Sequence, residues 1–176
     1  MTRLPASNVL VAFSFLSIVL AGGNGGAASD AGPAPAPADK PAARKVPGFD
    51  VTWTELTPEQ KAEYMKSTVL PKMKATFQAF DAKEFKQFKC TNCHGKDAKE
   101  RKFKMPNPSI LNLPGTPADM AALLQKEPKL QRWAKFMGEE VKPQMADLLG
   151  IPAFDPKKRE AGGFGCKNCH VIKKAE

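Results

Sequence analysis

Two copies of one pentapeptide pattern constrain this chain more than any other feature. They are Cys90-Thr91-Asn92-Cys93-His94 and Cys166-Lys167-Asn168-Cys169-His170. The chain has 176 residues with four cysteines and two histidines, and all six of these side chains fall inside the two C-x-x-C-H units. Residues three apart lie on the same face of a helical turn, so the two thiols of each unit can reach one common ligand.

This pattern is typical of covalent haem c attachment, in which two cysteines bind the vinyl groups of one porphyrin. The histidine that follows them then supplies the proximal ligand of the iron. We therefore expect two haem c groups, with His94 and His170 as the proximal iron ligands. The residues expected to hold the haems covalently are Cys90, Cys93, Cys166 and Cys169.

Two other interpretations of the cysteines need no haem. Two C-x-x-C pairs could bind one zinc ion, and four cysteines in an exported protein could form two disulfides. Neither requires a histidine directly after each second cysteine, whereas this chain places both of its histidines there. The sequence therefore favours haem over zinc or disulfides.

The first residues are typical of an export signal. Arg3 supplies a positive charge, and residues 9–21 form an apolar run of thirteen residues, which is short for a membrane span. We assign residues 1–29 to a signal peptide, with cleavage between Ala21 and Ser29; an uncleaved anchor helix is the alternative. Because bacterial haem c attachment takes place outside the cytoplasmic membrane, we expect a periplasmic or otherwise exported bacterial protein that does not insert into the membrane after cleavage.

The rest of the chain divides into a linker and one domain. Residues 30–46 are rich in proline and alanine and offer almost nothing to bury, which predicts a disordered linker. Residues 47–176 have the size of a single domain. They contain few of the valines and isoleucines that sheets favour, so we expect a mostly α-helical fold.

Several helix starts can be read from the sequence. Thr57 and Gln60 form a Thr-x-x-Gln capping box around Pro58, a residue favoured in the first helical position. Thr116 before Pro117 repeats this start signal, and Pro128 begins a further helix.

The sequence repeats itself ahead of the two motifs. Methionine, valine, proline and methionine recur at the same spacing, as Met65, Val69, Pro71 and Met73 and again as Met137, Val141, Pro143 and Met145. The methionines are offset by 72 residues and the motifs by 76. We interpret this as an internal duplication, in which a methionine helix is followed by a C-x-x-C-H helix, twice. Repeat one covers about residues 57–94 and repeat two about residues 129–170.

Because both histidines are already used as proximal ligands, the sixth position of each iron can be filled by methionine, by lysine or an amino terminus, by water, or by nothing. Methionine is the expected distal ligand, because a thioether is the usual partner of histidine in electron-transfer haems. The repeat favours one equivalent pair, and we predict Met73 with Met145, since each follows a helix-breaking proline by two residues. Met65 with Met137 is the alternative pair. Met105, beside a proline shortly after the first motif, is a rival distal ligand for the first haem.

The two motifs and the signal resemble a small dihaem c-type cytochrome of the bacterial periplasm. The order of the parts, with a methionine helix before each haem motif, resembles the haem units of the photosynthetic reaction-centre cytochrome subunit. Val69-Leu70-Pro71 ahead of Cys90 is similar to a Val-Leu-Pro stretch in relatives of that subunit. The resemblance covers roughly residues 57–94 and 129–170 and implies an electron carrier, not an enzyme.

Positive charge is concentrated around both motifs. The formal net charge is +9, and lysines crowd the residues that surround the first motif. Such charge would steer an acidic redox protein toward an exposed haem edge, although an ordinary solvated surface explains it equally well. Export and the absence of interleaved stacking residues argue against nucleic acid as a partner.

We therefore expect a periplasmic electron-transfer protein that carries two covalently attached c-type haems with His/Met ligation of each iron. The alternative is a haem enzyme or gas-sensing protein in which one haem is five-coordinate. That alternative would follow if a methionine serves only one of the two irons.

Overall fold

The computed structural model describes residues 42–158 and 162–174. The expected signal peptide at 1–29 and the expected linker up to residue 41 lie outside these ranges. The end of that linker belongs to the folded part: Val46 is 1% exposed in the core, and the N–H of Arg44 donates to the carbonyl of Gly150 at 2.7 Å. The fold therefore begins before residue 47, where the sequence predicted its start.

The fold is mostly α-helical, as expected. Strand pairing among the described residues is limited to isolated bridges, and no helix there has the length and apolar content that a membrane span requires. The elements η1 and η2 are π-helical turns and η3 is a 3-10 turn. In chain order the elements are α1 (Pro58–Tyr64), η1 (Met65–Val69), α2 (Leu70–Phe80), α3 (Cys90–His94), α4 (Pro117–Lys126), α5 (Pro128–Phe136), η2 (Met137–Val141), α6 (Lys142–Leu148) and η3 (Cys166–Asn168).

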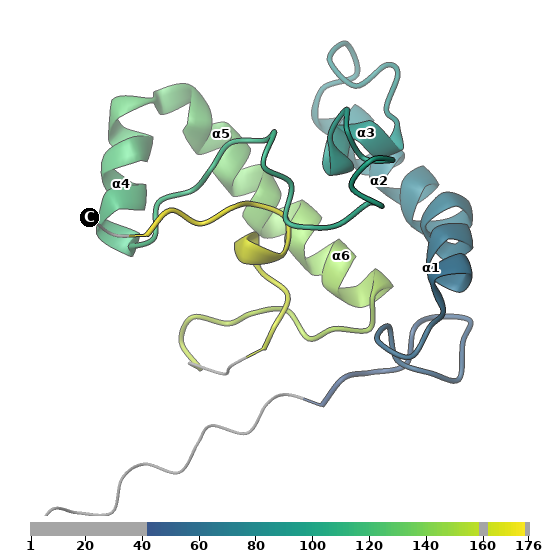
Figure 1. The fold of residues 1–176 in the computed structure, drawn as a ribbon. Helices are drawn as coiled ribbons and strands as arrows, with labels where there is room; N and C mark the ends of the chain where they lie inside the picture. Colours follow the sequence, from purple (N-terminus) through teal and green to yellow (C-terminus); the bar gives the residue numbers. More distant parts are fainter. Residues whose placement is uncertain (1–41, 159–161, 175–176) are drawn as a thin grey trace, which may run out of the picture. The chain divides into compact units, whose positions relative to one another are not determined.

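The first long helix runs from α1 through η1 into α2 (Figure 1). Its start is the predicted capping box: Gln60 N–H donates to the Thr57 hydroxyl at 3.2 Å, and Thr57 N–H donates to the Gln60 side chain at 2.9 Å. In η1 the backbone hydrogen bonds reach five residues back in place of four: the N–H of Leu70 donates to the carbonyl of Met65. Pro71 follows, whose ring would clash with the carbonyl four residues earlier in a regular helix. A widened turn at this point accommodates the proline.

The second long helix, from α5 through η2 into α6, repeats this construction. It begins at Pro128, as predicted, and in η2 the N–H of Lys142 donates to the carbonyl of Met137. Pro143 again follows directly. Each π turn begins at the first methionine of the repeated pattern and ends at its valine. The predicted duplication of the methionine helix is therefore confirmed as two similar helical units.

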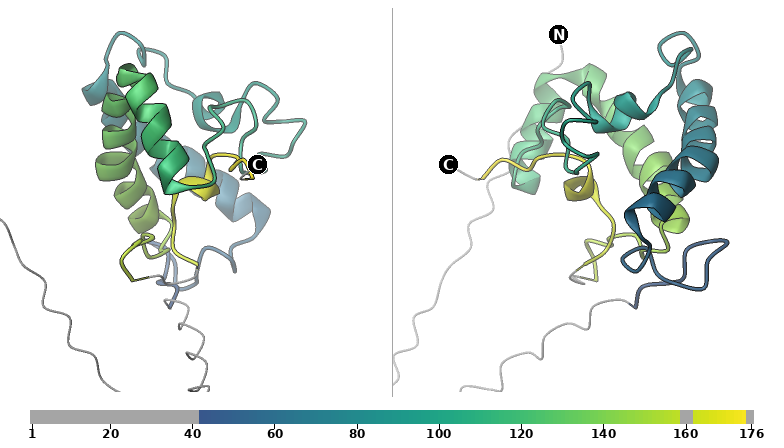
Figure 2. Two further views of the ribbon diagram at one scale, coloured as in Figure 1. Left: turned by 90° about the vertical axis from the view of Figure 1, so that its left-hand side faces the viewer. Right: turned by 45° about the vertical axis from the view of Figure 1, so that its right-hand side comes forward.

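Aromatic side chains join the two long helices, which Figure 2 shows from two further directions. The ring of Phe77 on α2 lies 5.1 Å from that of Phe136 on α5, and Phe80 stacks on Phe136 at 4.0 Å. Phe85 and Phe88, which follow α2, lie 4.9 and 4.8 Å from Phe77. Burying a side chain of this size stabilises a fold by roughly 1.5–3 kcal/mol. This cluster therefore supplies much of the attraction between the two units.

Tyr64, at the end of α1, ties the first long helix to the end of the second. Its hydroxyl donates to the carbonyl of Leu148 at 2.8 Å, and its side chain is buried. A Tyr64→Phe variant should lose about 1 kcal/mol of the free energy of unfolding, because the carbonyl of Leu148 loses its donor. Urea denaturation of the variant and the wild type measures this difference.

The burial of Tyr64 also makes part of the stability depend on pH. Burial raises the pKa of Tyr64 above its ordinary value of 10.0. A group whose pKa is higher in the folded state stabilises the fold fully below the ordinary pKa and loses that contribution as pH rises through the folded pKa. Tyr64 is the single tyrosine of the chain, so the absorbance of its phenolate reports its titration without overlap. Titration at the ordinary value would contradict the raised pKa.

Candidate functional site

The first C-x-x-C-H motif forms the single turn of α3. Its middle residue, Asn92, caps this turn, because its side-chain oxygen accepts a hydrogen bond from Lys89 N–H at 2.7 Å. Gly95 ends the turn with a φ of +89°, a conformation that other residues rarely adopt. A Cβ at Gly95 would also lie 2.8 Å from the Asp97 carboxylate and 2.9 Å from the Asn107 side chain. Glycine is therefore required directly after the first motif.

The second motif repeats the cap but forms a tighter turn, the 3-10 turn η3, in place of the expected helix. Gly165 N–H donates to the side-chain oxygen of Asn168 at 2.8 Å, which matches the bond made by Asn92. The chain then pairs at once with residues 107–113, so the turn is not extended into an α-helix. The sequence analysis missed the capping role of the two asparagines, although they occupy the same place in both motifs.

A cavity of about 490 Å³ lies beside the first motif. Its lining includes Cys90 and Cys93, the imidazole of His94, and Met65 from η1. Most of the remaining wall is apolar and comes from α1, η1, the start of α2, Trp53 and Phe103. Cavities of roughly 300–1,000 Å³ with an apolar wall and a few placed polar groups are typical of ligand and cofactor sites.

His94 is half-buried, and its Nδ1 is buried without a hydrogen bond of good geometry. Burial lowers the pKa of His94; the nearby backbone of Phe103 opposes this change, and the positive charge of Arg101 adds to it. The imidazole therefore stays neutral at neutral pH, which is the form that can bind a metal. The ring of Phe103 meets that of His94 edge to face, with 5.4 Å between centroids.

His170 has a defined hydrogen-bond partner. Its Nδ1 lies 2.8 Å from the carbonyl oxygen of Leu111. A carbonyl only accepts, so Nδ1 carries a proton, and in the neutral imidazole Nε2 is then the nitrogen with the lone pair. This is the usual arrangement of a metal-binding histidine, whose second nitrogen donates to a carbonyl or carboxylate. The sequence could not identify this partner, because a backbone carbonyl 59 residues away has no signature of its own.

The second cysteine of each motif is more buried than the first. Burial is the main cause that raises the pKa of Cys93 to about 12 and that of Cys169 to about 11, and the neighbouring thiol of Cys169 raises the pKa of Cys93 further. Cys90 and Cys166 are exposed, and all four thiols are free. Within residues 42–158 and 162–174, no group of three or more histidine, cysteine and acidic side chains is arranged to hold a metal ion.

The structure separates the methionines of the first repeat. Met73, the predicted distal ligand, is 2% exposed in the aromatic core and does not line the cavity. Met65, the alternative, lines the cavity together with His94. Both methionines lie on one helical stripe, so spacing alone could not separate them. The cavity beside the first motif is lined by η1 and by Leu70 at the start of α2, and it does not reach Met73.

The other candidate methionines also differ in their surroundings. Met145 is half-buried and packs, together with Cys169, against the small cluster of Ala146, Leu149 and Phe164. Met137 packs against the aromatic core alone, whereas Met65 and Met145 pack against both the core and the small cluster. Met105 is half-buried in the loop after the first motif and does not line the cavity. Met65 and Met145 thus contact both clusters, and of the two only Met65 lines the cavity beside the first motif.

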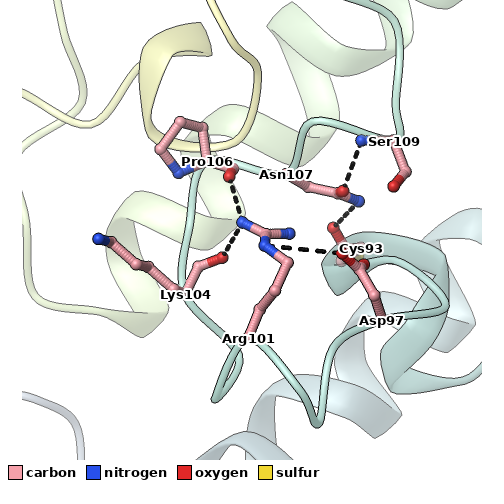
Figure 3. A network of polar contacts seen from close by, with 7 residues as sticks. All are labelled: Cys93, Asp97, Arg101, Lys104, Pro106, Asn107 and Ser109. Atoms are coloured by element: carbon pink, nitrogen blue, oxygen red, sulfur yellow. Dashed lines mark hydrogen bonds and ion pairs between the residues drawn. The ribbon is translucent and has the colours of Figure 1, made fainter.

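Arg101 holds the loop that follows the first motif (Figure 3). Its Nη2 donates to the carbonyls of Lys104 and Pro106 at 2.7 and 2.8 Å, and its Nε lies 3.8 Å from the carboxylate of Asp97. The other terminal nitrogen, Nη1, is buried without a partner, as is one oxygen of Asp97. The loop therefore surrounds the positive guanidinium group of Arg101, which lies near His94.

Asn107 joins the two motifs. Its side-chain amide donates to the carbonyl of Cys93 at 3.0 Å, and its side-chain oxygen accepts from Ser109 N–H at 2.8 Å (Figure 3). Its backbone N–H donates to the carbonyl of Cys169 at 2.9 Å. The residue is 0% exposed. The loop between the first motif and α4, in which the sequence predicted only Met105 as a rival ligand, therefore lies against both motifs.

Comparison of the chain with protein-family models, with curated proteins and with solved structures found no match. The chemistry that the site can perform therefore follows from the groups that its own residues supply. These are two motifs with free thiols and a histidine each, a cavity beside the first motif, and one buried asparagine between them.

Proposed function

We propose that this chain is an electron-transfer protein of the bacterial periplasm, in which each C-x-x-C-H motif binds one haem c covalently. The main observation behind this proposal is that one apolar cavity is lined by Cys90, Cys93 and His94. Two thiols and one imidazole are the groups by which haem c is attached and its iron is ligated.

The lining of the cavity fits a haem. His94 would be the proximal ligand, and Met65 would supply a thioether as the distal ligand. The bound haem would supply one-electron chemistry between ferrous and ferric iron. Trp53, Val69 and Leu70 contribute apolar surface that excludes water and disfavours the more highly charged ferric state. Lysines at the same cavity can meet the acidic propionate groups; they are Lys61, Lys66 and Lys102.

The second site would lie outside this cavity. Cys166, Cys169 and His170 would hold the second haem, and the carbonyl of Leu111 would orient His170. Met145 is the proposed distal ligand here, because Met65 and Met145 pack against the same small cluster as Cys169 and Met65 is assigned to the first haem. Cys166 is exposed, as Cys90 is at the first site, so a partner protein could approach the edge of either haem.

An acidic redox protein suits the surface around the motifs. The chain has a formal net charge of +9. Exposed lysines surround the first motif at positions 89, 96, 99, 102 and 104. Positive charge of this density raises the rate at which an acidic partner finds the surface, and salt weakens the effect.

Intact mass and a haemochrome assay of the exported protein test the proposal. We expect two haems on each mature chain, because each motif has two free thiols followed by histidine. Optical spectra should show two low-spin haems with a thioether charge-transfer band when oxidised. A colourless protein, with its sulfurs bridged to one another or bound to zinc, would refute the proposal. Two haems with a high-spin fraction that binds carbon monoxide would favour a haem enzyme or gas sensor instead.

A further inference from the structure

We infer that Asn107 is a positioning residue that holds the two haem motifs together, so that the two haems exchange electrons directly within one chain. This inference rests on the proposed function. It adds a specific role for one buried side chain that neither binds a haem nor ligates an iron.

The hydrogen bonds of Asn107 bring the backbones of the motifs within the span of one residue. The carbonyl of Cys93 accepts from its side chain at 3.0 Å, and the carbonyl of Cys169 accepts from its backbone N–H at 2.9 Å. These two carbonyls belong to the second cysteine of each motif, directly before each histidine. The haem attachment points are therefore neighbours in space, although they lie 76 residues apart in the chain.

The residues after Asn107 continue this backbone pairing along the second motif. Asn107 and His170 form a parallel bridge, as do Leu113 and Ile172. The N–H of Leu113 donates to Val171 at 2.9 Å, and its carbonyl accepts from the N–H of Lys173 at 2.8 Å. We name residues 107–113 the strap. Because the carbonyl of Leu111 in this strap also meets His170, the strap fixes both the position of the second motif and the orientation of its histidine.

Asn107 is suited to this role because it is fully buried and well paired. A polar side chain in the interior destabilises a fold unless its donors and acceptors have partners. Here the amide meets Cys93, and the side-chain oxygen meets Ser109 N–H. An apolar residue of similar size would leave the carbonyl of Cys93 without this donor and release the first motif from the strap. The proximity of Cys169 to the Cys93 thiol, which raises the pKa of Cys93, agrees with this placement.

The contact between the two motifs has a direct consequence for electron transfer. When an external one-electron donor protein reduces one haem, the electron can pass to the other. With both haems bound, the first iron would return from ferrous to ferric as the second went from ferric to ferrous, and no covalent bond or proton would change place. An external one-electron acceptor protein removes the electron from the second haem. For such a step, the protein must hold the two haems close together at a fixed distance.

Electron paramagnetic resonance of the full-length holoprotein tests the inference. In the fully oxidised wild type, the two ferric signals should be broadened by their magnetic interaction, and reducing one haem should narrow the other signal. Asn107→Leu keeps the backbone N–H but loses both side-chain hydrogen bonds. In this variant we expect the broadening to disappear or to differ from molecule to molecule, because the distance between the two irons is no longer fixed. Asn112→Leu makes the same change at an exposed position of the strap and should leave the signals unchanged.

The outcomes separate the inference from the proposed function. Two haems per chain without magnetic interaction in the wild type would overturn the inference, whatever the variants do. Unchanged broadening in Asn107→Leu would remove the role of this residue. Fewer than two haems on the wild-type chain would instead overturn the proposed function. If Asn107→Leu does not fold, the wild-type spectra still decide whether the two irons are neighbours.

Discussion

Replacing Cys90 and Cys93 together by alanine should remove one haem from the mature chain and leave the other attached. Each motif has its own pair of free thiols, so covalent attachment at one does not depend on the thiols of the other. Intact mass and the haemochrome assay count the remaining haem. A second effect should accompany the loss, because the cavity of about 490 Å³ beside the first motif would no longer be filled.

The loss of stability from this double variant should be large. Truncating one buried aromatic side chain costs roughly 3–5 kcal/mol, because the cavity it leaves collapses only in part. A haem is larger than any side chain, so we expect a loss above this range, measured by urea denaturation. The matched control is Cys166→Ala with Cys169→Ala, which should also remove one haem but cost less, because neither of these cysteines lines the cavity beside the first motif. Retention of both haems in either double variant would contradict covalent attachment at these thiols.

Met65→Leu should convert the first haem from six-coordinate low spin to five-coordinate high spin and open it to carbon monoxide. Met65 lines the cavity that contains His94, and its thioether is the proposed distal ligand. Leucine has similar volume but no ligating atom, so the packing is kept while the ligand is lost. We expect part of the thioether charge-transfer band to disappear and the potential of this haem to fall, because a methionine ligand raises it.

Met73→Leu is the matched control for this variant. Met73 is 2% exposed in the aromatic core, where a change between methionine and leucine conserves volume. We expect its spectra to match the wild type, with a cost below about 1.5 kcal/mol in the free energy of unfolding. The opposite pattern, with the band lost in Met73→Leu and kept in Met65→Leu, would restore the ligand that the sequence favoured.

Local features of the fold were predictable because they depend on neighbours in the chain. Thr57 with Gln60 caps the first long helix as predicted, and Thr116 caps α4 through Asp119 N–H at 3.1 Å. The start at Pro128 and the similarity of the two helical units also follow from short patterns. A cap or a repeat needs only residues a few positions apart, so its signal survives in the sequence.

The site was predictable only in part. The identity of the four thiols and two imidazoles follows from the motifs, whereas the partner of His170 is a backbone carbonyl that any residue could supply. Asn107 carried no signal either, because one asparagine in a loop of mixed composition resembles many others. Its importance depends on two carbonyls that lie 14 residues before it and 62 after it.

The sequence by itself determined the chemistry that this chain can offer: two pairs of thiols with a histidine after each, and two helices marked by methionine and proline. Tertiary structure alone decided which methionine shares a cavity with His94 and that one buried asparagine holds the motifs side by side. The physical reason is that residue types and short spacings are local properties of the chain. The face against which a helix packs, and the carbonyl that a buried amide reaches, depend on how distant segments fold together.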